Sequence, residues 1–71
     1  MTDKQYSKYL EYISILLKNT PLPPEAKDHK LMGNYKEYRE LHISGDLIII
    51  YSNEKNILKL VRIGSHSQLF Q

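Results

Sequence analysis

Apolar side chains recur every three or four positions along residues 2–19, which is the period of an α-helix. They form one stripe along the predicted helix: Tyr6, Tyr9, Leu10, Ile13, Leu16 and Leu17. Thr2 and Gln5 have the spacing of a capping box, in which each side chain bonds the backbone N–H of the other residue. Asn19 suits the helix end, and Pro21 prevents continuation. The pattern therefore predicts an N-terminal helix that covers a core with one face.

Residues 22–34 have no regular period, because Pro23, Pro24 and the pair Gly33 and Asn34 interrupt helical and strand patterns alike. We expect a connector here. Loops of this length in a small domain are often functional, and His29 lies inside this one.

Residues 35–43 are expected to form a strand whose two faces differ. One face carries Tyr38, Glu40 and His42, and the other carries Arg39, Leu41 and Ile43. Since both faces carry large side chains, either a bulge interrupts this strand or the face with Tyr38 and His42 lines a cleft.

Residues 47–51 are apolar at odd and even positions alike, which indicates a central strand buried on both faces. Residues 57–63 form a further expected strand, and the polar residues 44–46 and 52–56 are expected to be turns. A helix, a long loop and three strands joined by short turns predict an α+β fold. In it, the N-terminal helix packs on a three-stranded antiparallel sheet, as a single domain over residues 1–71.

Composition narrows the class of protein. A chain of 71 residues is one small domain with a thin stability margin, and without cysteine it has neither disulfides nor a thiolate metal site. The longest apolar run is too short to span a bilayer, and the N-terminus lacks a secretory signal pattern. We therefore expect a soluble, cytoplasmic protein without a membrane partner. The net charge of +2 does not by itself indicate nucleic acid.

Three histidines are the main candidates for chemistry: His29 in the connector, His42 at a strand end and His66 after the last strand. Gly64 is expected to allow a sharp turn that frees His66 from the sheet. Each histidine alone is typical of a solvated surface, but the predicted meander brings the three to one edge of the sheet. Asp46 follows His42 across the turn, where it either orients an imidazole or is an ordinary turn residue.

A zinc site built from these residues lacks the local histidine spacing of helical or knuckle sites. A nucleophilic triad is disfavoured because no serine lies in a G-x-S-x-G elbow. Acid–base cleavage of RNA requires no such local spacing of residues. It requires one imidazole to accept the 2′-hydroxyl proton, an acid for the leaving 5′-oxygen, and cations on the phosphate. The sequence contains all three kinds of group.

Cations and aromatic residues accompany the histidines. Arg62 precedes His66 by four residues, and Arg39 and Lys30 flank the other two histidines, so we expect these cations to bind phosphate. Phe70 and Tyr38 suit stacking on a base, with core or rim packing as the alternative for each.

Four blocks of sequence, taken in order, resemble a known family. They are KDHKLMG at residues 27–33, YRELHI at 38–43, DLIIIY at 46–51 and RIGSHSQLF at 62–70. Together they resemble the YafQ-type toxins of the RelE/ParE superfamily in bacterial toxin–antitoxin systems. The resemblance implies a ribosome-dependent mRNA endonuclease that needs no metal or other cofactor. Its implied partners are an antitoxin, which also represses the operon, and the ribosome with its mRNA.

The resemblance also implies site residues. The family's active-site positions correspond to His29, His42, Asp46, His66 and Phe70. His66 would be a principal acid or base, with His29 and His42 sharing proton transfer or phosphate contact. Arg62 matches a basic position near the scissile phosphate.

Two features depart from the family pattern. Leu47 stands where family members usually have a tryptophan, and the chain starts in what resembles the second helix of the family. We therefore expect a truncated RelE-like fold that lacks the first strand and helix and has an exposed sheet edge.

Three functional readings follow from the sequence. The leading one is an mRNA endonuclease toxin. The second is a degenerate, non-catalytic protein that binds only antitoxin or ribosome. A gyrase poison of the ParE branch would not need acid–base residues, so the histidines with Asp46 argue against it.

Overall fold

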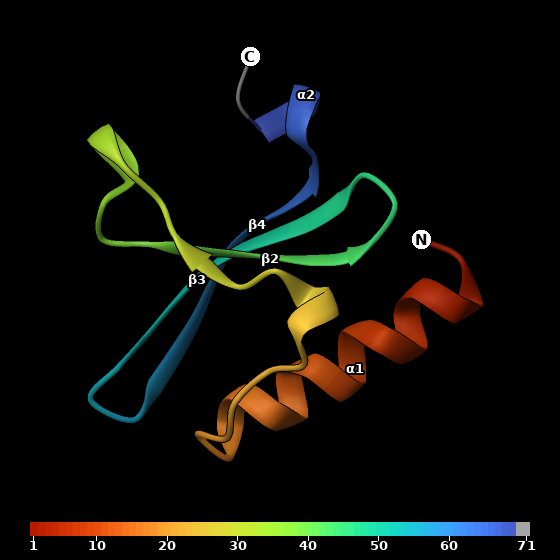
Figure 1. Ribbon diagram of the computed structural model, residues 1–71, viewed down its shortest axis with the longest axis horizontal. Helices are drawn as coiled ribbons and strands as arrows, with labels where there is room; N and C mark the ends of the chain where they lie inside the picture. The colour runs from red at the N-terminus through yellow and green to blue at the C-terminus, as the bar shows by residue number, and fades with distance from the viewer. Residues whose placement is uncertain (70–71) are drawn as a thin grey trace.

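One antiparallel sheet carries a helix on one of its faces in this α+β fold (Figure 1). The computed structural model describes residues 1–69. The elements in chain order are α1 (Asp3–Leu17), β1 (His29–Lys30), β2 (Arg39–Ser44), β3 (Leu47–Glu54), β4 (Ile57–Ser65) and α2 (His66–Leu69). The strands lie in the order β1-β2-β3-β4.

Helix α1 starts as the sequence predicts and ends one residue earlier, with Lys18 as its C-cap in place of Asn19. The backbone N–H of Gln5 donates to Thr2 Oγ1 at 3.1 Å, and the backbone N–H of Thr2 donates to Gln5 Oε1 at 2.9 Å. The helix ends at Leu17, and Asn19 adopts a left-handed φ of 57°, a conformation that terminates helices. The predicted capping box is confirmed.

The buried face of α1 differs from the predicted stripe. Tyr12, which the stripe omits, is 1% exposed, whereas Tyr6, Leu10 and Leu17 are 53%, 49% and 64% exposed. The helix therefore turns the side that carries Tyr12 and Leu16 to the sheet. Part of the predicted stripe remains open to solvent.

Strand β3 is central and buried on both faces, as its apolar sequence predicts. Under α1 lies one cluster: Tyr12, Leu16, Ala26, Leu41, Ile43, Ile49 and Tyr51. The opposite face carries a second cluster: Ile48, Ile50 and Leu69, with Leu31 and Tyr38 packed against it. The face opposite α1 is therefore partly apolar core and partly available for a polar site.

The expected three-stranded sheet is wrong by one strand. Residues His29–Lys30 form β1, which pairs with β2 in the register His29↔Glu40 and Lys30↔Arg39. A two-residue strand has no alternation for sequence reasoning to detect, and its pairing depends on a partner strand further along the chain.

Strand β2 also starts later than predicted, at Arg39, because Gly33–Tyr35 forms a 3₁₀ turn with Gly33 at φ 67°. The register shift in β2 lies between His42 and Ser44, so alternation is regular from Arg39 to His42 and the bulge considered from the sequence does not separate Tyr38 from Leu41. The β3–β4 turn is shorter than the predicted 52–56. Lys55 and Asn56 form it with φ of 52° and 64°, as in a two-residue hairpin of type I′.

Strand β4 is the last strand in the order of the sheet (Figure 1). It carries apolar side chains that are open to solvent. Leu60, Val61 and Ile63 are 43%, 38% and 44% exposed, and with Arg62, Tyr9 of α1 and Ile49 of β3 they line a shallow pocket. No helix formed by residues 1–69 is long and apolar enough to cross a membrane.

Candidate active site

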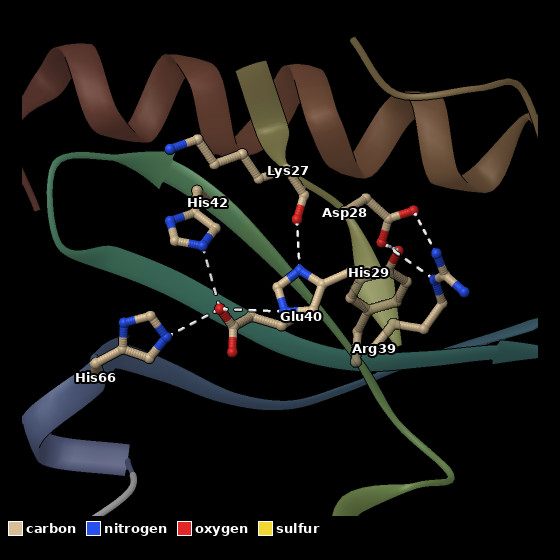
Figure 2. A network of polar contacts seen from close by, with 8 residues as sticks. Lys27, Asp28, His29, Arg39, Glu40, His42 and His66 are labelled. Atoms are coloured by element: carbon tan, nitrogen blue, oxygen red, sulfur yellow. Dashed lines mark hydrogen bonds and ion pairs between the residues drawn. The ribbon is translucent and has the colours of Figure 1, made fainter. Parts of the chain in front are cut away.

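A buried carboxylate, Glu40, is the centre of a cluster of three imidazoles (Figure 2). Its Oε1 atom lies 2.9 Å from Nε2 of His66, 3.1 Å from Nε2 of His42 and 3.9 Å from Nε2 of His29. Glu40 is 3% exposed, and within residues 1–69 it is the sole charged residue so deeply buried. A buried carboxylate needs charged or hydrogen-bonding partners, and here the imidazoles supply them.

Strand pairing brings these groups together on the sheet face opposite α1. Glu40 and His42 are two residues apart on β2, so their side chains project to the same face. The Cα partner of Glu40 on β1 is His29. Gly64 lies in the same cross-strand row as His42, and His66 follows it at the start of α2.

Gly64 serves this site through its lack of a side chain. It lies within β4, and positive φ among the described glycines occurs at Gly33 and Gly45, so the expected sharp turn at Gly64 is wrong. A Cβ at this position would lie 2.8 Å from Oε1 of Gln68. That oxygen accepts a hydrogen bond from the backbone N–H of Ser65 at 3.0 Å. A side chain at position 64 would therefore displace the Gln68 side chain and weaken this hydrogen bond at the start of α2.

The His29 ring has a defined proton position. Its Nδ1 lies 2.7 Å from the backbone carbonyl oxygen of Lys27. Because a carbonyl oxygen only accepts hydrogen bonds, Nδ1 carries the proton. Nε2, which faces Glu40, then bears the lone pair in the neutral ring and a second proton in the imidazolium. His29 is thus held with one nitrogen fixed by the backbone and the other turned into the site.

The imidazoles are close enough to act on one substrate. The ring centroids of His42 and His66 lie 5.6 Å apart, and those of His29 and His42 lie 6.4 Å apart. His29 and His66 keep about half of their side-chain surface exposed, 51% and 48%, so a ligand can reach them. A cluster of this kind can accept a proton at one ring and donate a proton from another.

A second polar network lies beside this cluster (Figure 2). Nε and Nη2 of Arg39 each donate to the carboxylate of Asp28 at 3.1 Å, and the Tyr51 hydroxyl also donates to it. Burial, and then the hydrogen bond to Asp28, raise the pKa of Tyr51 well above its usual value. The Asp28 hydrogen bond is likewise the main cause of the raised pKa of Arg39. Tyr51 therefore remains a neutral donor and Arg39 a cation under ordinary conditions.

Two further predicted site residues lie near the cluster. Arg62 is exposed on β4 and shares the Cα partner Ile50 with Glu40, so it lies in the same cross-strand row, beside a register shift. It also lines the pocket with Tyr9 and Ile49. Asp46 is exposed in the β2–β3 turn, next to Leu47, whose partner on β4 is Ser65. It therefore lies at the same end of the sheet as His66.

The other predicted cations lie differently. Arg39 and Glu40 are consecutive on β2, so their side chains lie on opposite faces of the sheet. The guanidinium of Arg39 binds Asp28. Lys30 is the cross-strand partner of Arg39 and is exposed. Neither cation is brought to the histidine face. Phe70 lies outside the described residues, and Tyr38 packs against the apolar cluster of that face.

Sequence reasoning did not choose Glu40 as a site residue. The sequence did contain a clue: Glu40 and His42 are two residues apart and so lie on the same face of a strand, and the other face of that strand supplies apolar core. An acidic residue beside a histidine on a strand face is common on solvated sheets. The burial that distinguishes Glu40 arises only when His29, His42 and His66 surround it.

Three of these residues also have the arrangement of a metal site. One ligand atom each from Glu40, His42 and His66 lie within 4.8 Å of one another. Imidazole nitrogens with a carboxylate oxygen suit zinc and copper. The residues therefore fit a transition-metal ion as well as proton transfer.

The chain combines an α+β fold with a cluster of histidines around a buried carboxylate, which is a site suited to proton transfer. Comparison with known proteins identifies the family. The family of bacterial toxins of type II toxin–antitoxin systems named YafQ matches residues 1–71. The chain belongs to the YafQ toxin family.

Curated relatives are named as toxins. The chain is 46% identical over 66 residues to a putative toxin YafQ of Haemophilus influenzae. This match covers 87% of this chain and 65% of the relative. It is 42% identical over 69 residues to the mRNA interferase toxin YafQ of Escherichia coli K12, covering 96% of this chain and 73% of that toxin. The chain thus spans about two thirds to three quarters of the length of these relatives.

Solved structures share the fold. YafQ in the E. coli DinJ–YafQ toxin–antitoxin complex matches with a TM-score of 0.83 and 37% identity, over 93% of this chain and 74% of that one. A copper-bound mutant toxin from Helicobacter pylori matches with a TM-score of 0.86 and 44% identity, over 90% and 73% of the two chains. The predicted family and α+β class are confirmed.

Proposed function

We propose that this chain is an mRNA interferase, an endoribonuclease that cleaves ribosome-bound mRNA by histidine acid–base chemistry. The observation that supports this most directly is the convergence of His29, His42 and His66 on Glu40. Membership in the YafQ family and the name of the E. coli relative support the same activity.

In the proposed reaction, an imidazole removes the proton of a 2′-hydroxyl, and the 2′-oxygen attacks the adjacent phosphorus. The bond from phosphorus to the 5′-oxygen breaks, and a second imidazole donates a proton to that oxygen. The products are a 2′,3′-cyclic phosphate and a 5′-hydroxyl. His66, near the exposed end of the sheet, is the proposed principal acid or base, with His29 and His42 sharing proton transfer or phosphate contact.

Glu40 holds the imidazoles for this chemistry. Its Oε1 accepts from the rings of His66 and His42, which fixes the orientation of both imidazoles. The carboxylate is buried, so RNA meets the imidazoles before it meets the negative charge. Glu40 therefore joins the proposed site as a positioning residue.

Arg62 is the proposed phosphate ligand, because it is an exposed cation in the same cross-strand row as Glu40. Asp46 keeps its proposed role beside the histidines, and Phe70 its proposed role in base stacking. The proposed partner is an antitoxin, in keeping with the DinJ–YafQ complex of E. coli. The proposed chemistry moves protons between side chains and substrate and uses no metal.

Induction in growing bacteria tests the function. Wild-type chain should arrest growth and produce new mRNA 5′ ends, mapped by sequencing, whereas His66→Ala should reduce cleavage by about 10² to 10⁴-fold. Purified protein should cut mRNA on programmed ribosomes much faster than the same RNA alone. Folded wild-type chain that leaves growth and mRNA ends unchanged would rule the proposal out.

A second candidate is a non-catalytic member that binds antitoxin or ribosome without cutting RNA. The uncovered apolar residues of β4 favour it, because they offer a surface for a protein partner. Circular dichroism melting separates the two. A cooperative melt of the isolated chain favours the interferase, and ordering only on addition of antitoxin favours the binding protein.

A further inference from the structure

Asp28 links the connector to two strands of the sheet at the residue before His29. Its carboxylate accepts two hydrogen bonds from Arg39 of β2 and one from Tyr51 of β3. The paired donation from one guanidinium defines both the position and the plane of the carboxylate. Tyr51 is 1% exposed, so this end of the network is anchored in the core under α1.

The network is connected to the histidine cluster through the backbone. Asp28 and His29 are neighbours in the chain, and so are their respective partners Arg39 and Glu40. Since successive strand residues face opposite sides, one pair lies on the α1 side of the sheet and the other on the histidine side. The register His29↔Glu40 and the ion pair between Asp28 and Arg39 therefore hold the same two segments together.

Strand β1 depends on such contacts more than the other strands do. It has two residues, both exposed, at the end of a connector in which Lys27 adopts a left-handed φ of 50°. A ladder of this length gives few backbone hydrogen bonds. Nε2 of His29 lies 3.9 Å from Oε1 of Glu40, which is a longer contact than the 2.9 Å of His66. A small shift of β1 would therefore remove His29 from the cluster.

We propose that Asp28 is a positioning residue for RNA cleavage, which with Arg39 and Tyr51 holds the His29 imidazole at Glu40. This inference rests on the proposed function. It gives Arg39 the task of holding Asp28 in place of the phosphate contact expected from the sequence.

A double-mutant cycle tests the coupling. Asp28→Asn keeps an acceptor for Tyr51 but loses the charge that Arg39 binds. It should lower kcat on ribosome-bound mRNA by on the order of 10²-fold, because a misplacement of about 1 Å costs that much, while KM changes less than about twofold. In a His29→Ala background, Asp28→Asn should have little further effect, because both changes remove the same imidazole.

Matched variants separate positioning from folding. Tyr51→Phe removes one donor to Asp28 and should lower kcat in the same direction by a smaller factor. Glu37→Gln removes an exposed carboxylate outside both networks and should leave kcat unchanged. If Asp28→Asn lowers kcat equally with and without His29, the carboxylate acts on the fold as a whole and the proposal is overturned.

An NMR measurement keeps this inference separate from the proposed activity. In wild-type protein the His29 Nδ1–H, bonded to the Lys27 carbonyl, should give its own nitrogen-correlated signal. Asp28→Asn should shift or broaden this signal and leave that of His66 in place. An unchanged His29 signal would overturn the positioning role even in an active enzyme, whereas a shifted one in an inactive chain would leave it standing.

Discussion

The Oε1 atom of Glu40 lies 2.9 Å from Nε2 of His66, although the two residues are 26 positions apart in the chain. One strand supplies the carboxylate, and the helix after the last strand supplies the imidazole. The same oxygen also meets His42 at 3.1 Å. The proposed chemistry therefore depends on a charged group inside the sheet that holds exposed imidazoles in place.

Replacing Glu40 by Gln should separate its charge from its shape. The amide keeps one acceptor oxygen but loses the negative charge that the rings share, so their orientation is no longer fixed. We expect kcat to fall by about 10² to 10⁴-fold, since the proton transfers lose their geometry. Single-turnover cleavage of ribosome-bound mRNA measures this, with thermal melting to verify folding. An unaltered rate would exclude a role for the carboxylate.

Replacing Gly64 by Ala should affect His66 indirectly, through the hydrogen bond at the start of α2. The new methyl group would lie 2.8 Å from the Gln68 oxygen that accepts from the Ser65 backbone, so the flexible Gln68 side chain must move and this hydrogen bond is weakened. Cleavage should fall by less than about tenfold, because the start of α2 loses one hydrogen bond while His66 keeps its contact with Glu40. A matched change at Gly45→Asn, in the β2–β3 turn with φ +55°, should have little effect because asparagine tolerates this conformation.

Arg62→Gln should weaken RNA binding most at low salt. Each phosphate that is neutralised releases counterions, so loss of one contact reduces the slope of log affinity against log salt by about 0.7 for single strands. Fluorescence anisotropy with a labelled RNA, over a range of salt concentrations, measures the slope. Lys4→Gln on α1 changes net charge equally, away from the histidine face, and serves as the control. Equal slopes for Arg62→Gln and wild type would contradict the assignment.

The two sides of α1 should differ in their effect on stability. Leu16 is 6% exposed in the core, so Leu16→Ala should cost about 2 to 5 kcal/mol of unfolding free energy. Leu10 is 49% exposed, and Leu10→Ala should change it by less than about 1 kcal/mol. Urea denaturation of the two variants measures the difference. Equal losses would mean that another surface covers Leu10 in solution.

Zinc should bind the cluster and inhibit cleavage. Glu40, His42 and His66 bring their ligand atoms within 4.8 Å, and a bound ion would occupy the nitrogens that transfer protons. His42→Ala should weaken zinc affinity by more than about tenfold in calorimetric titration, whereas His29→Ala, outside this set, should change it less. EDTA should restore activity after zinc and leave the metal-free enzyme unchanged. Loss of activity with EDTA alone would instead indicate a metal-dependent reaction.

Much of the fold follows from local pattern. The capping residues Thr2 and Gln5, the helix terminator Asn19 and the doubly apolar strand β3 each act within a few residues of chain, so periodicity and local chemistry predict them. The family resemblance likewise depends on residue order alone. Strand β1 was missed because its two residues form a strand only by pairing with Arg39 and Glu40 of β2.

By itself, the sequence determined the helix, the three longer strands, the family and three candidate histidines, because those depend on residue type and spacing. Tertiary structure decided which groups meet. It buried Glu40 among the imidazoles, turned Arg39 to Asp28, and placed Arg62 in the cross-strand row of Glu40. The physical reason is strand register and alternation: pairing between distant segments sets each side chain on one face or the other, and a shift of one residue would exchange those faces.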